Sequence, residues 1–479
     1  MENSIQYRSA KMWQIRLYPL ASGCSNAFML LMMYVSYLMV GGYGVLAVAT
    51  GGILTATRIF DGVTDPIVAF ISDRFCPKKG KLRILLWSAW GIMAACCIIL
   101  FYVGVGHGLV FFLIFYLLYI IGYTLLGVTD KIAATILTND PKQRPLVSKW
   151  ATIYTMVVMG VLSPVIMSMV EANGNEYSIS TLRIFCAIIL GVSAVMMALS
   201  TFAIAGKDTA ENINLGAVKE HKTSIKDCLK VIKENRSLQM FIVAAASDKL
   251  ALQTAGNTAF ATLLFGVLIG KLTFSSIVQA LVMPITIVGA FLAATMGIKK
   301  GNKHALVFWT WVAIIATAVT AVFYMLVDFR QIFTFSSFGG IIATLLFVVL
   351  TIARQVGQYG ASAVNNAMLS DVADYENYRS GNFLPGTVGA AYTFVDKIVS
   401  AFATTVASLS LATIGYVSVM PQPTDEPTMA IRVLVTIMTL GLPILGWICT
   451  IIAMKFYPLT KEKMAEIQSA VAERNEARK

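Results

Sequence analysis

Apolar stretches of about 20 residues recur from Leu17 to Phe456, with only short polar interruptions between them. A stretch of that length can cross the hydrocarbon core of a bilayer as a helix. Hydrophobic residues make up 57% of the chain and charged residues 13%, whereas a soluble domain carries about 25% charged residues. A soluble core could not cover so much apolar surface, which excludes a soluble enzyme. The sequence predicts an all-α polytopic membrane protein.

The apolar stretches predict twelve spans. We expect them near residues 17–40, 45–72, 84–106, 109–137, 149–171, 184–205, 237–268, 274–297, 304–327, 340–370, 385–415 and 433–454. Most of the 37 Lys and Arg residues fall in the loops on one side of these spans. By the positive-inside rule, both termini are cytoplasmic. The net charge of +12 is therefore a topology signal, and we expect no nucleic-acid partner.

The longest predicted cytoplasmic connection divides the spans six and six. This gives an N-terminal six-helix bundle at 1–205, a basic linker at 206–235, a C-terminal six-helix bundle at 236–456 and a cytoplasmic tail at 457–479. Two such bundles, with a binding site near the membrane midplane, are typical of rocking secondary transporters. The tail has Met464, Ile467 and Val471 at helical spacing, and we expect it to lie in solution or on the membrane surface.

Motifs of enzyme and metal chemistry are missing from the sequence. The seven cysteines show no paired zinc-type spacing, and no HExxH, GxSxG or phosphate-binding glycine loop is present. We therefore expect no enzymatic activity, no cofactor and no resident metal ion.

The second span contains three charged residues on one helical face. In the run RIFDGVTDP, Arg58, Asp61 and Asp65 follow one another at spacings of three and four. Each charge facing lipid at mid-membrane would cost about 2.5–3.5 kcal/mol, so the three should face one cavity. Two neighbouring carboxylates can hold a proton or bind a small cation such as Na⁺. The alternative is a buried salt-bridge cluster that only locks helices together.

Three acid–base dipeptides also lie in apolar surroundings: Asp130-Lys131, Asp248-Lys249 and Asp396-Lys397. Adjacent helical residues point about 100° apart, so each dipeptide should pair with other helices more readily than with itself. Together with Arg354 in the tenth span, they could form salt bridges that break and reform during alternating access. For Asp248 and Lys249, snorkelling toward the cytoplasmic interface is an equal alternative.

Uncharged polar and aromatic residues within the spans complete the candidates. They include Asn26 in the first span, Thr64 in the second, Tyr123 and Thr124 in the fourth and Gln358 in the tenth. Tyrosines in spans are more often packing or anchoring residues, so Tyr123 is the only one that we single out.

Three motifs carry a resemblance to a known family. The stretch RIFDGVTDPIVAFISDR, the NDPKQR run at 139–144 and the stretch DVADYENYRSGNFLPGTVGAAYTFVDKIVSAFA from Asp371 touch both halves of the chain. They resemble signatures of the glycoside–pentoside–hexuronide:cation symporters, the melibiose-carrier branch of the major facilitator superfamily. The resemblance implies the major facilitator fold and cation-coupled sugar transport.

The resemblance also implies roles for individual residues. Asp61 and Asp65 match the paired cation-binding carboxylates of the family. Tyr123 and Thr124 match a Tyr-Thr step whose threonine contributes to the cation site, and Lys397 matches a lysine linked to coupling.

The residues that would bind sugar depart from the melibiose carrier. Asn26 replaces an acidic sugar ligand, Gly127 replaces another, Lys131 replaces a stacking tryptophan and Ala151 replaces an arginine. The added lysine favours an anionic substrate such as a hexuronide, unless Asp130 neutralises it. Thr64 replaces an asparagine, which leaves H⁺ and Na⁺ both open as the coupling ion.

The predicted function is symport of a sugar, glycoside or hexuronide with H⁺ or Na⁺ by alternating access. The predicted cation and coupling residues are Arg58, Asp61, Thr64, Asp65, Thr124 and Lys397. The predicted substrate residues are Asn26, Tyr123, Asp130, Lys131, Arg354, Gln358 and Asp396. We expect a monomer surrounded by lipid as a multi-pass protein of the plasma membrane, in bacteria the inner membrane. The alternatives are a carrier of a non-sugar organic anion or amphiphile, a non-transporting sugar sensor and, least favoured, a membrane enzyme.

Overall fold

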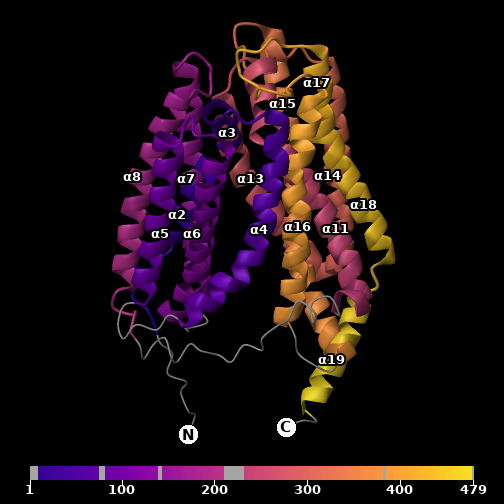
Figure 1. The fold of residues 1–479 in the computed structure, drawn as a ribbon. Coiled ribbons are helices and arrows are strands. Elements are labelled where there is room, and N and C mark those ends of the chain that lie inside the picture. The colour runs from indigo at the N-terminus through magenta and orange to yellow at the C-terminus, as the bar shows by residue number, and fades with distance from the viewer. Residues whose placement is uncertain (1–8, 75–80, 139–142, 210–230, 381–384, 477–479) are drawn as a thin grey trace. The chain divides into compact units, whose positions relative to one another are not determined.

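The computed structural model describes residues 9–74, 81–138, 143–209, 231–380 and 385–476, and the regular elements in these ranges are helices (Figure 1). The chain forms two compact units. Unit 1 comprises Met1–Thr50, Ala56–Glu220 and Val417–Met420, and unit 2 comprises Gly51–Thr55, His221–Tyr416 and Pro421–Lys479. The predicted boundaries at 205 and 236 stay predictions, since most of the linker lies outside the described residues.

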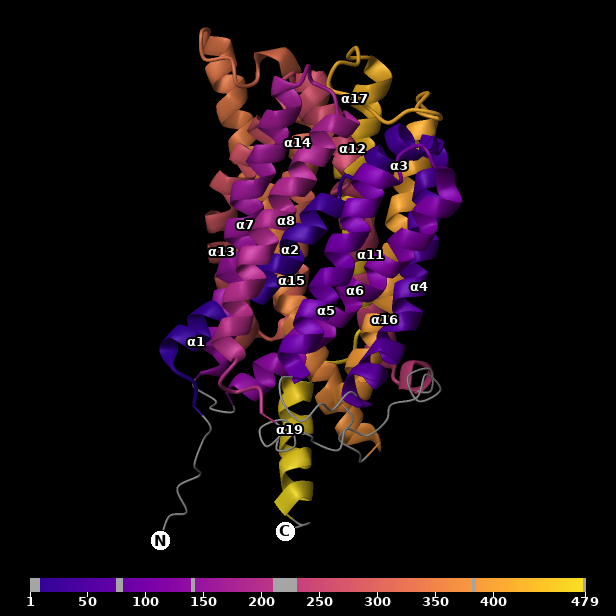
Figure 2. The same ribbon diagram turned by 60° about the vertical axis from the view of Figure 1, so that its left-hand side comes forward.

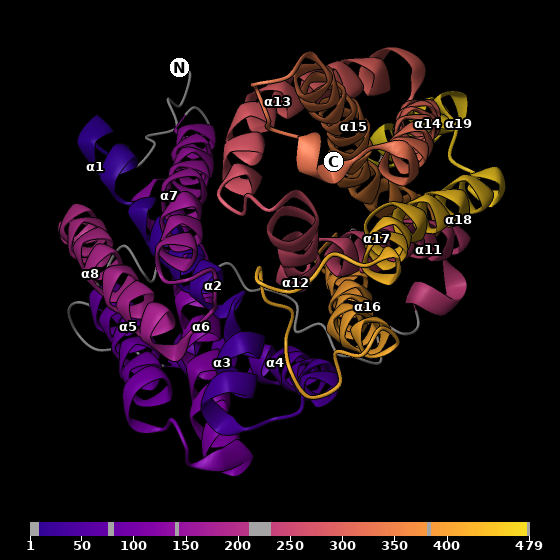
Figure 3. The same ribbon diagram turned by 90° about the horizontal axis from the view of Figure 1, so that it is seen from above.

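Unit 1 is a bundle of membrane-length helices. Its elements are α1 (Met12–Leu17), α2 (Leu20–Met32), α3 (Val35–Tyr43), α4 (Ala47–Arg74, apart from Gly51–Thr55), α5 (Lys81–Ile98), the π-helix Ile99–Val103, α6 (Gly108–Leu137), α7 (Arg144–Ala172) and α8 (Ile179–Ile204). Helix α2 packs against α7 and α8, and α5 packs against α6 and α8 (Figure 3). The short α1 contacts α7 and α8 (Figure 2).

Unit 2 is a second bundle. Its elements are α11 (Arg236–Ala255), α12 (Thr258–Ala261), the π-helix Thr262–Ile269, α13 (Phe274–Lys300), α14 (Asn302–Leu326), the 3-10 helix Phe329–Gln331, α15 (Phe338–Ser380), α16 (Pro385–Ala412), α17 (Met429–Thr436), the π-helix Ile437–Gly441, α18 (Leu442–Phe456) and α19 (Lys461–Glu476). Helix α15 packs against α13 and α14, and α11 packs against α16 and α18.

Nine helices of the described residues are long and apolar enough to cross a membrane, or up to eleven if each of two bent pairs counts as one span. This confirms an all-α, multi-pass membrane protein. Helix α4 is not among the candidates, because Arg58 and Asp61 interrupt its apolar run. The total of twelve spans therefore stays a prediction.

Two spans that we expected as single helices are bent pairs. Helices α2 and α3 meet at 45°, and α11 and α12 meet at 50°. At the second bend, Gly256 ends α11. Asn257 then caps the start of α12, because its side chain accepts a hydrogen bond from the backbone amide of Ala259. A side-chain cap of this kind satisfies an amide that the new helix cannot pair internally.

The C-terminal segment is packed, which corrects the expectation of a solvated tail. Its helix α19 contacts α15 and is drawn in yellow at the bottom of Figure 1. Met464 and Ile467 are buried in the core cluster of unit 2, with Ile467 0% exposed. Arg474 donates hydrogen bonds to the carbonyl oxygens of Asn377 and Tyr378, each at 3.0 Å. The apolar residues at helical spacing therefore mark a packing face.

Candidate cation and substrate site

Helices α4 and α6 are joined by a hydrogen bond between Asp61 and Thr124. The Thr124 hydroxyl donates to Asp61 Oδ1 at 2.8 Å, and Thr124 is only 6% exposed. Thr64, which is also buried, lies on α4 and donates its hydroxyl to the backbone carbonyl of Asp61 at 3.1 Å. The structure thus brings together three of the residues predicted for cation coupling.

Arg58 and Asp65, the other charged residues of the predicted face, also lie on α4. Arg58 is exposed, and Tyr116 on α6 is within electrostatic range of both Arg58 and Asp61. Asp65 lies within α4, one turn beyond Asp61, but its side chain is outside the described part of the structure. Among the described side chains, the contact between α4 and α6 brings the Asp61 carboxylate together with the hydroxyl groups of Thr64 and Thr124.

Such a group of oxygens can bind a small cation or a proton. Carboxylate and hydroxyl oxygens are the ligands that hard cations prefer, and a carboxylate can equally take a proton. A hydroxyl that donates to Asp61 still has lone pairs with which it can accept or bind a cation. Asp61 and Thr124 could accordingly hold either H⁺ or a dehydrated Na⁺.

Helix α6 carries a ladder of aromatic rings that ends beside Thr124. The ring centroids of Phe112 and Tyr116 are 5.1 Å apart, those of Tyr116 and Tyr119 are 6.0 Å apart, and those of Tyr119 and Tyr123 are 6.3 Å apart. Their spacing of three or four residues places them along one face of α6. Tyr123, the predicted substrate residue, thus stacks on Tyr119 and directly precedes Thr124, the predicted cation-site residue.

Asn26 on α2 makes two contacts through its amide. Its Nδ2 group donates to the carbonyl of Ser22 at 2.7 Å and to the hydroxyl of Thr155 on α7 at 3.0 Å. Asn26 and the Asp61 contact both lie in unit 1, on different helices. The residue stays a predicted substrate ligand, because no contact here tests that role.

Asp130 on α6 accepts hydrogen bonds from hydroxyl groups at and just before the start of α2. Tyr18 donates to Asp130 Oδ1 at 2.5 Å, and Ser22 donates to Oδ2 at 2.8 Å. This confirms that Asp130 pairs with other helices. Because both carboxylate oxygens are already engaged, the contacts support a role in locking α6 against α2. The side chain of Lys131 lies outside the described residues.

In unit 2, the Asp248-Lys249 dipeptide of α11 is directed toward two different helices. Asp248 is 6% exposed and accepts a hydrogen bond of 2.6 Å from the Thr450 hydroxyl on α18. Lys249 Nζ lies 3.9 Å from Asp396 Oδ2 on α16. Pairing with other helices is again confirmed, and the burial of Asp248 contradicts the snorkelling alternative for that residue.

The remaining predicted residues lie on α15 and α16. Arg354 and Gln358 are one turn apart on α15, both half-buried, and Tyr324 of α14 lies within electrostatic range of Arg354. Lys397 is half-buried on α16, next to Asp396. The buried Asp396 Oδ1 atom has no hydrogen-bond partner among the described residues.

Sequence analysis missed several residues that complete these contacts, namely Tyr18, Ser22, Tyr116, Thr155 and Thr450. One signal was available, since Tyr18, Ser22 and Asn26 recur at intervals of four and so form a polar stripe on the first span. No such signal marks Thr450, which is a single hydroxyl in an apolar run.

Comparison with known proteins gives consistent results. The glucuronide carrier protein homolog of Escherichia coli (strain K12) is 24% identical over 442 residues, which cover 88% of this chain and 87% of that protein. The putative glycoside/cation symporter YagG of the same strain is 22% identical over 457 residues, which cover 93% and 91%.

Solved structures share the fold at low sequence identity. The nucleoside transporter NupG has a TM-score of 0.60 at 13% identity and covers 93% of this chain and 99% of its own. The Escherichia coli fucose:proton symporter FucP has a TM-score of 0.50 at 13% identity and covers 94% and 98%. A family model described as MFS/sugar transport protein matches residues 19–461. The chain therefore belongs to the MFS/sugar transport protein family and is a membrane transporter of the major facilitator fold, not an enzyme.

Proposed function

We propose that this protein is a secondary transporter that moves a sugar, glycoside or hexuronide across the membrane together with H⁺ or Na⁺. The observation that carries the proposal is the hydrogen bond between Asp61 and Thr124, which places a carboxylate beside a buried hydroxyl within a membrane bundle. Relatives named as a glucuronide carrier homolog and a glycoside/cation symporter support the substrate class.

The mechanism that we propose is alternating access by two six-helix bundles joined through 206–235, with twelve spans and both termini cytoplasmic. The cation binds at Asp61, Thr64, Asp65 and Thr124, with Arg58 nearby, and neutralises part of the negative charge of the two carboxylates. Substrate residues come from both halves of the chain. They are Asn26, Tyr123 and Lys131 in the first half and Arg354, Gln358 and Asp396 in the second, while Asp130 locks α6 against α2. Because each bundle contributes ligands, substrate and cation together favour the state that reorients.

Within this function, we propose an anionic sugar such as a hexuronide as the favoured substrate. Lys131 and Arg354 each bring a positive charge into a membrane span, where a charge is costly unless it has a partner. A carboxylate on the substrate would supply that partner, and Arg354 can bind it through two parallel hydrogen bonds. A non-sugar organic anion would satisfy the same charges, so uptake of glucuronate must be compared with uptake of an aliphatic carboxylate of similar size.

Transport by proteoliposomes with an imposed H⁺ or Na⁺ gradient tests the proposal. We expect accumulation of the glycoside or hexuronide with one of the two gradients, and we expect Asp61→Asn to abolish it. Asp328→Asn is a matched control, since Asp328 caps the 3-10 helix Phe329–Gln331 in a loop and asparagine caps equally well. Gradient-driven uptake that is unchanged in Asp61→Asn would refute the coupling site.

A further inference from the structure

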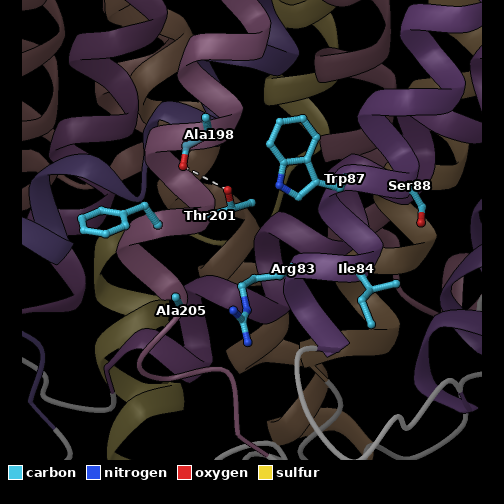
Figure 4. Close-up of a pocket in the computed structure, with 8 residues that line it drawn as sticks. Arg83, Ile84, Trp87, Ser88, Ala198, Thr201 and Ala205 are labelled. Carbon is cyan, nitrogen blue, oxygen red and sulfur yellow. Dashed lines mark hydrogen bonds between the residues drawn. The ribbon is translucent and has the colours of Figure 1, made fainter.

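A cavity of about 920 Å³, which is widely open on its outer side, lies in unit 1 between α5 and α8 (Figure 4). The lining residues that matter here are Arg83, Ile84 and Trp87 of α5 and Ala198, Thr201 and Phe202 of α8. None of them is a predicted transport residue. Seen from above, α6 lies between α5 and α4, the helix that carries Asp61 (Figure 3). The cavity is therefore separate from the cation site of the same unit.

Arg83 is fixed at one end of this cavity. Its Nε group donates to Asp208 Oδ2 at 3.3 Å, and Asp208 is almost fully buried. The same carboxylate accepts hydrogen bonds from the backbone amides of Leu82 and Arg83, each at 3.1 Å, in the first turn of α5. Asp208 therefore holds one edge of the guanidinium group in place.

The other edge of the guanidinium group is available for a ligand. The Arg83 side chain is 43% exposed, and neither of its terminal nitrogens has a hydrogen-bond partner within the described ranges. The two terminal nitrogens together provide four N–H donors in a planar arrangement that fits a phosphate or carboxylate. The free donors therefore favour an anionic group.

Away from Arg83, the walls of the cavity are apolar except for the hydroxyl groups of Ser88 and Thr201. Trp87 lies one turn along α5, with its ring between the two helices, and Thr201 lies on the opposite helix (Figure 4). Phe202 is 66% exposed, and its ring packs 5.5 Å from that of Trp13. The Thr201 hydroxyl donates to carbonyl groups of its own helix, at 2.8 Å to Met197 and 3.0 Å to Ala198. Such walls suit an acyl chain better than a sugar, which needs many hydrogen-bond partners.

From this arrangement we propose that the cavity binds an anionic glycerophospholipid, with the phosphate on Arg83 and an acyl chain between α5 and α8. Exposed apolar side chains of a membrane bundle contact lipid tails, and tryptophan is enriched at the level of the headgroups. Basic pockets between membrane helices on the cytoplasmic side bind anionic headgroups. Arg83 follows the predicted cytoplasmic loop with its several lysines, which agrees with this depth.

A lipid bound in this way touches both α5 and α8 and stabilises the folded protein by mass action. The test uses full-length protein purified in detergent and stripped of lipid. Native mass spectrometry measures binding of dioleoyl phosphatidylglycerol and of zwitterionic dioleoyl phosphatidylcholine. We expect the anionic lipid to bind at least about tenfold more tightly, because the choline cation of phosphatidylcholine neutralises the phosphate that Arg83 would contact, whereas the glycerol headgroup leaves it negative. We expect Arg83→Ala to remove this preference and Arg183→Ala, which alters an arginine at the other end of α8, to keep it.

Because Arg83→Ala also removes the partner of buried Asp208, a second variant leaves the Arg83–Asp208 pair intact. Ala198→Trp places an indole ring in the path of the acyl chain between α5 and α8 and should abolish binding of the anionic lipid. Its control, Val161→Trp, adds the same ring at an exposed position of α7. Equal affinity of wild type for the two lipids, or unchanged binding in Ala198→Trp, would overturn the proposal. So would a Tm increase from inorganic phosphate as large as that from phosphatidylglycerol, because it would show that no acyl chain is recognised.

Discussion

The Thr124 hydroxyl donates a hydrogen bond of 2.8 Å to Asp61 Oδ1, which connects α6 to α4 within unit 1. Its partner is the first carboxylate of a charged face in a membrane helix, so this contact is where coupling to a cation is expected. Thr124 is buried and Asp61 is half-buried, so each depends on the other for a hydrogen bond that water replaces only in part.

Replacing Thr124 by valine should weaken cation coupling. The substitution keeps the shape of the side chain but removes the hydroxyl, and a hydrogen bond to a charged group contributes about 1.5–3 kcal/mol. We therefore expect the cation concentration for half-maximal uptake to rise by at least about tenfold. Thr124→Ser retains the hydroxyl and should stay near wild type. A normal cation dependence in Thr124→Val would show that Asp61 binds the cation without this residue.

Replacing Tyr18 by phenylalanine should destabilise the fold more than it changes transport specificity. Tyr18 donates to the half-buried carboxylate of Asp130, and the loss of that donor removes a charge-assisted hydrogen bond, at a cost of about 1–3 kcal/mol. We expect a lower Tm in thermal unfolding, with the relative uptake of hexuronide and neutral glycoside unchanged. Tyr154→Phe, which loses only a hydrogen bond to the backbone carbonyl of Arg16, is the control. A switch in substrate preference would instead assign Asp130 to substrate binding.

The pair formed by Lys249 and Asp396 should contribute little to stability. The Nζ–Oδ2 distance is 3.9 Å, and the Lys249 side chain is 43% exposed. A double-mutant cycle with Lys249→Ala and Asp396→Ala should give a coupling free energy of unfolding below about 1 kcal/mol. The same variants should lower the rate of uptake if the pair acts in the transport cycle. A large coupling in stability, with unchanged uptake, would make the pair a structural lock.

Removing the packing of α19 should destabilise unit 2. Ile467 is fully buried in the core cluster of this unit, so Ile467→Ala should lower the free energy of unfolding by about 2–5 kcal/mol. Glu466→Ala is a neighbouring control, because Glu466 is exposed and its ion pair with Lys463 is on the surface. Thermal unfolding of both variants in detergent measures the difference. Equal Tm values for the two variants would show that the packing of α19 does not stabilise unit 2.

The sequence predicted which residues need partners but seldom which partners they have. Because adjacent side chains on a helix point about 100° apart, the sequence predicted that Asp248 and Lys249 pair with other helices. It did not identify Thr450, because a single hydroxyl in an apolar run has no periodic signal. Asp61 and Thr124 were placed in one site through a family resemblance, and their contact agrees with it.

The sequence by itself determined the helical, membrane-spanning class. In lipid, every backbone amide and carbonyl needs an internal partner, and the apolar runs are long enough for helices that supply one. Local pattern also showed which side chains of α4 cannot face lipid.

Only the tertiary structure decided how the helices meet. It set the bends at 45° and 50°, the burial of Ile467 in α19 and the cavity between α5 and α8. These features depend on the rotation of each helix about its axis and on side chains far apart in the chain. Residue spacing within one helix fixes a face but does not specify what that face contacts.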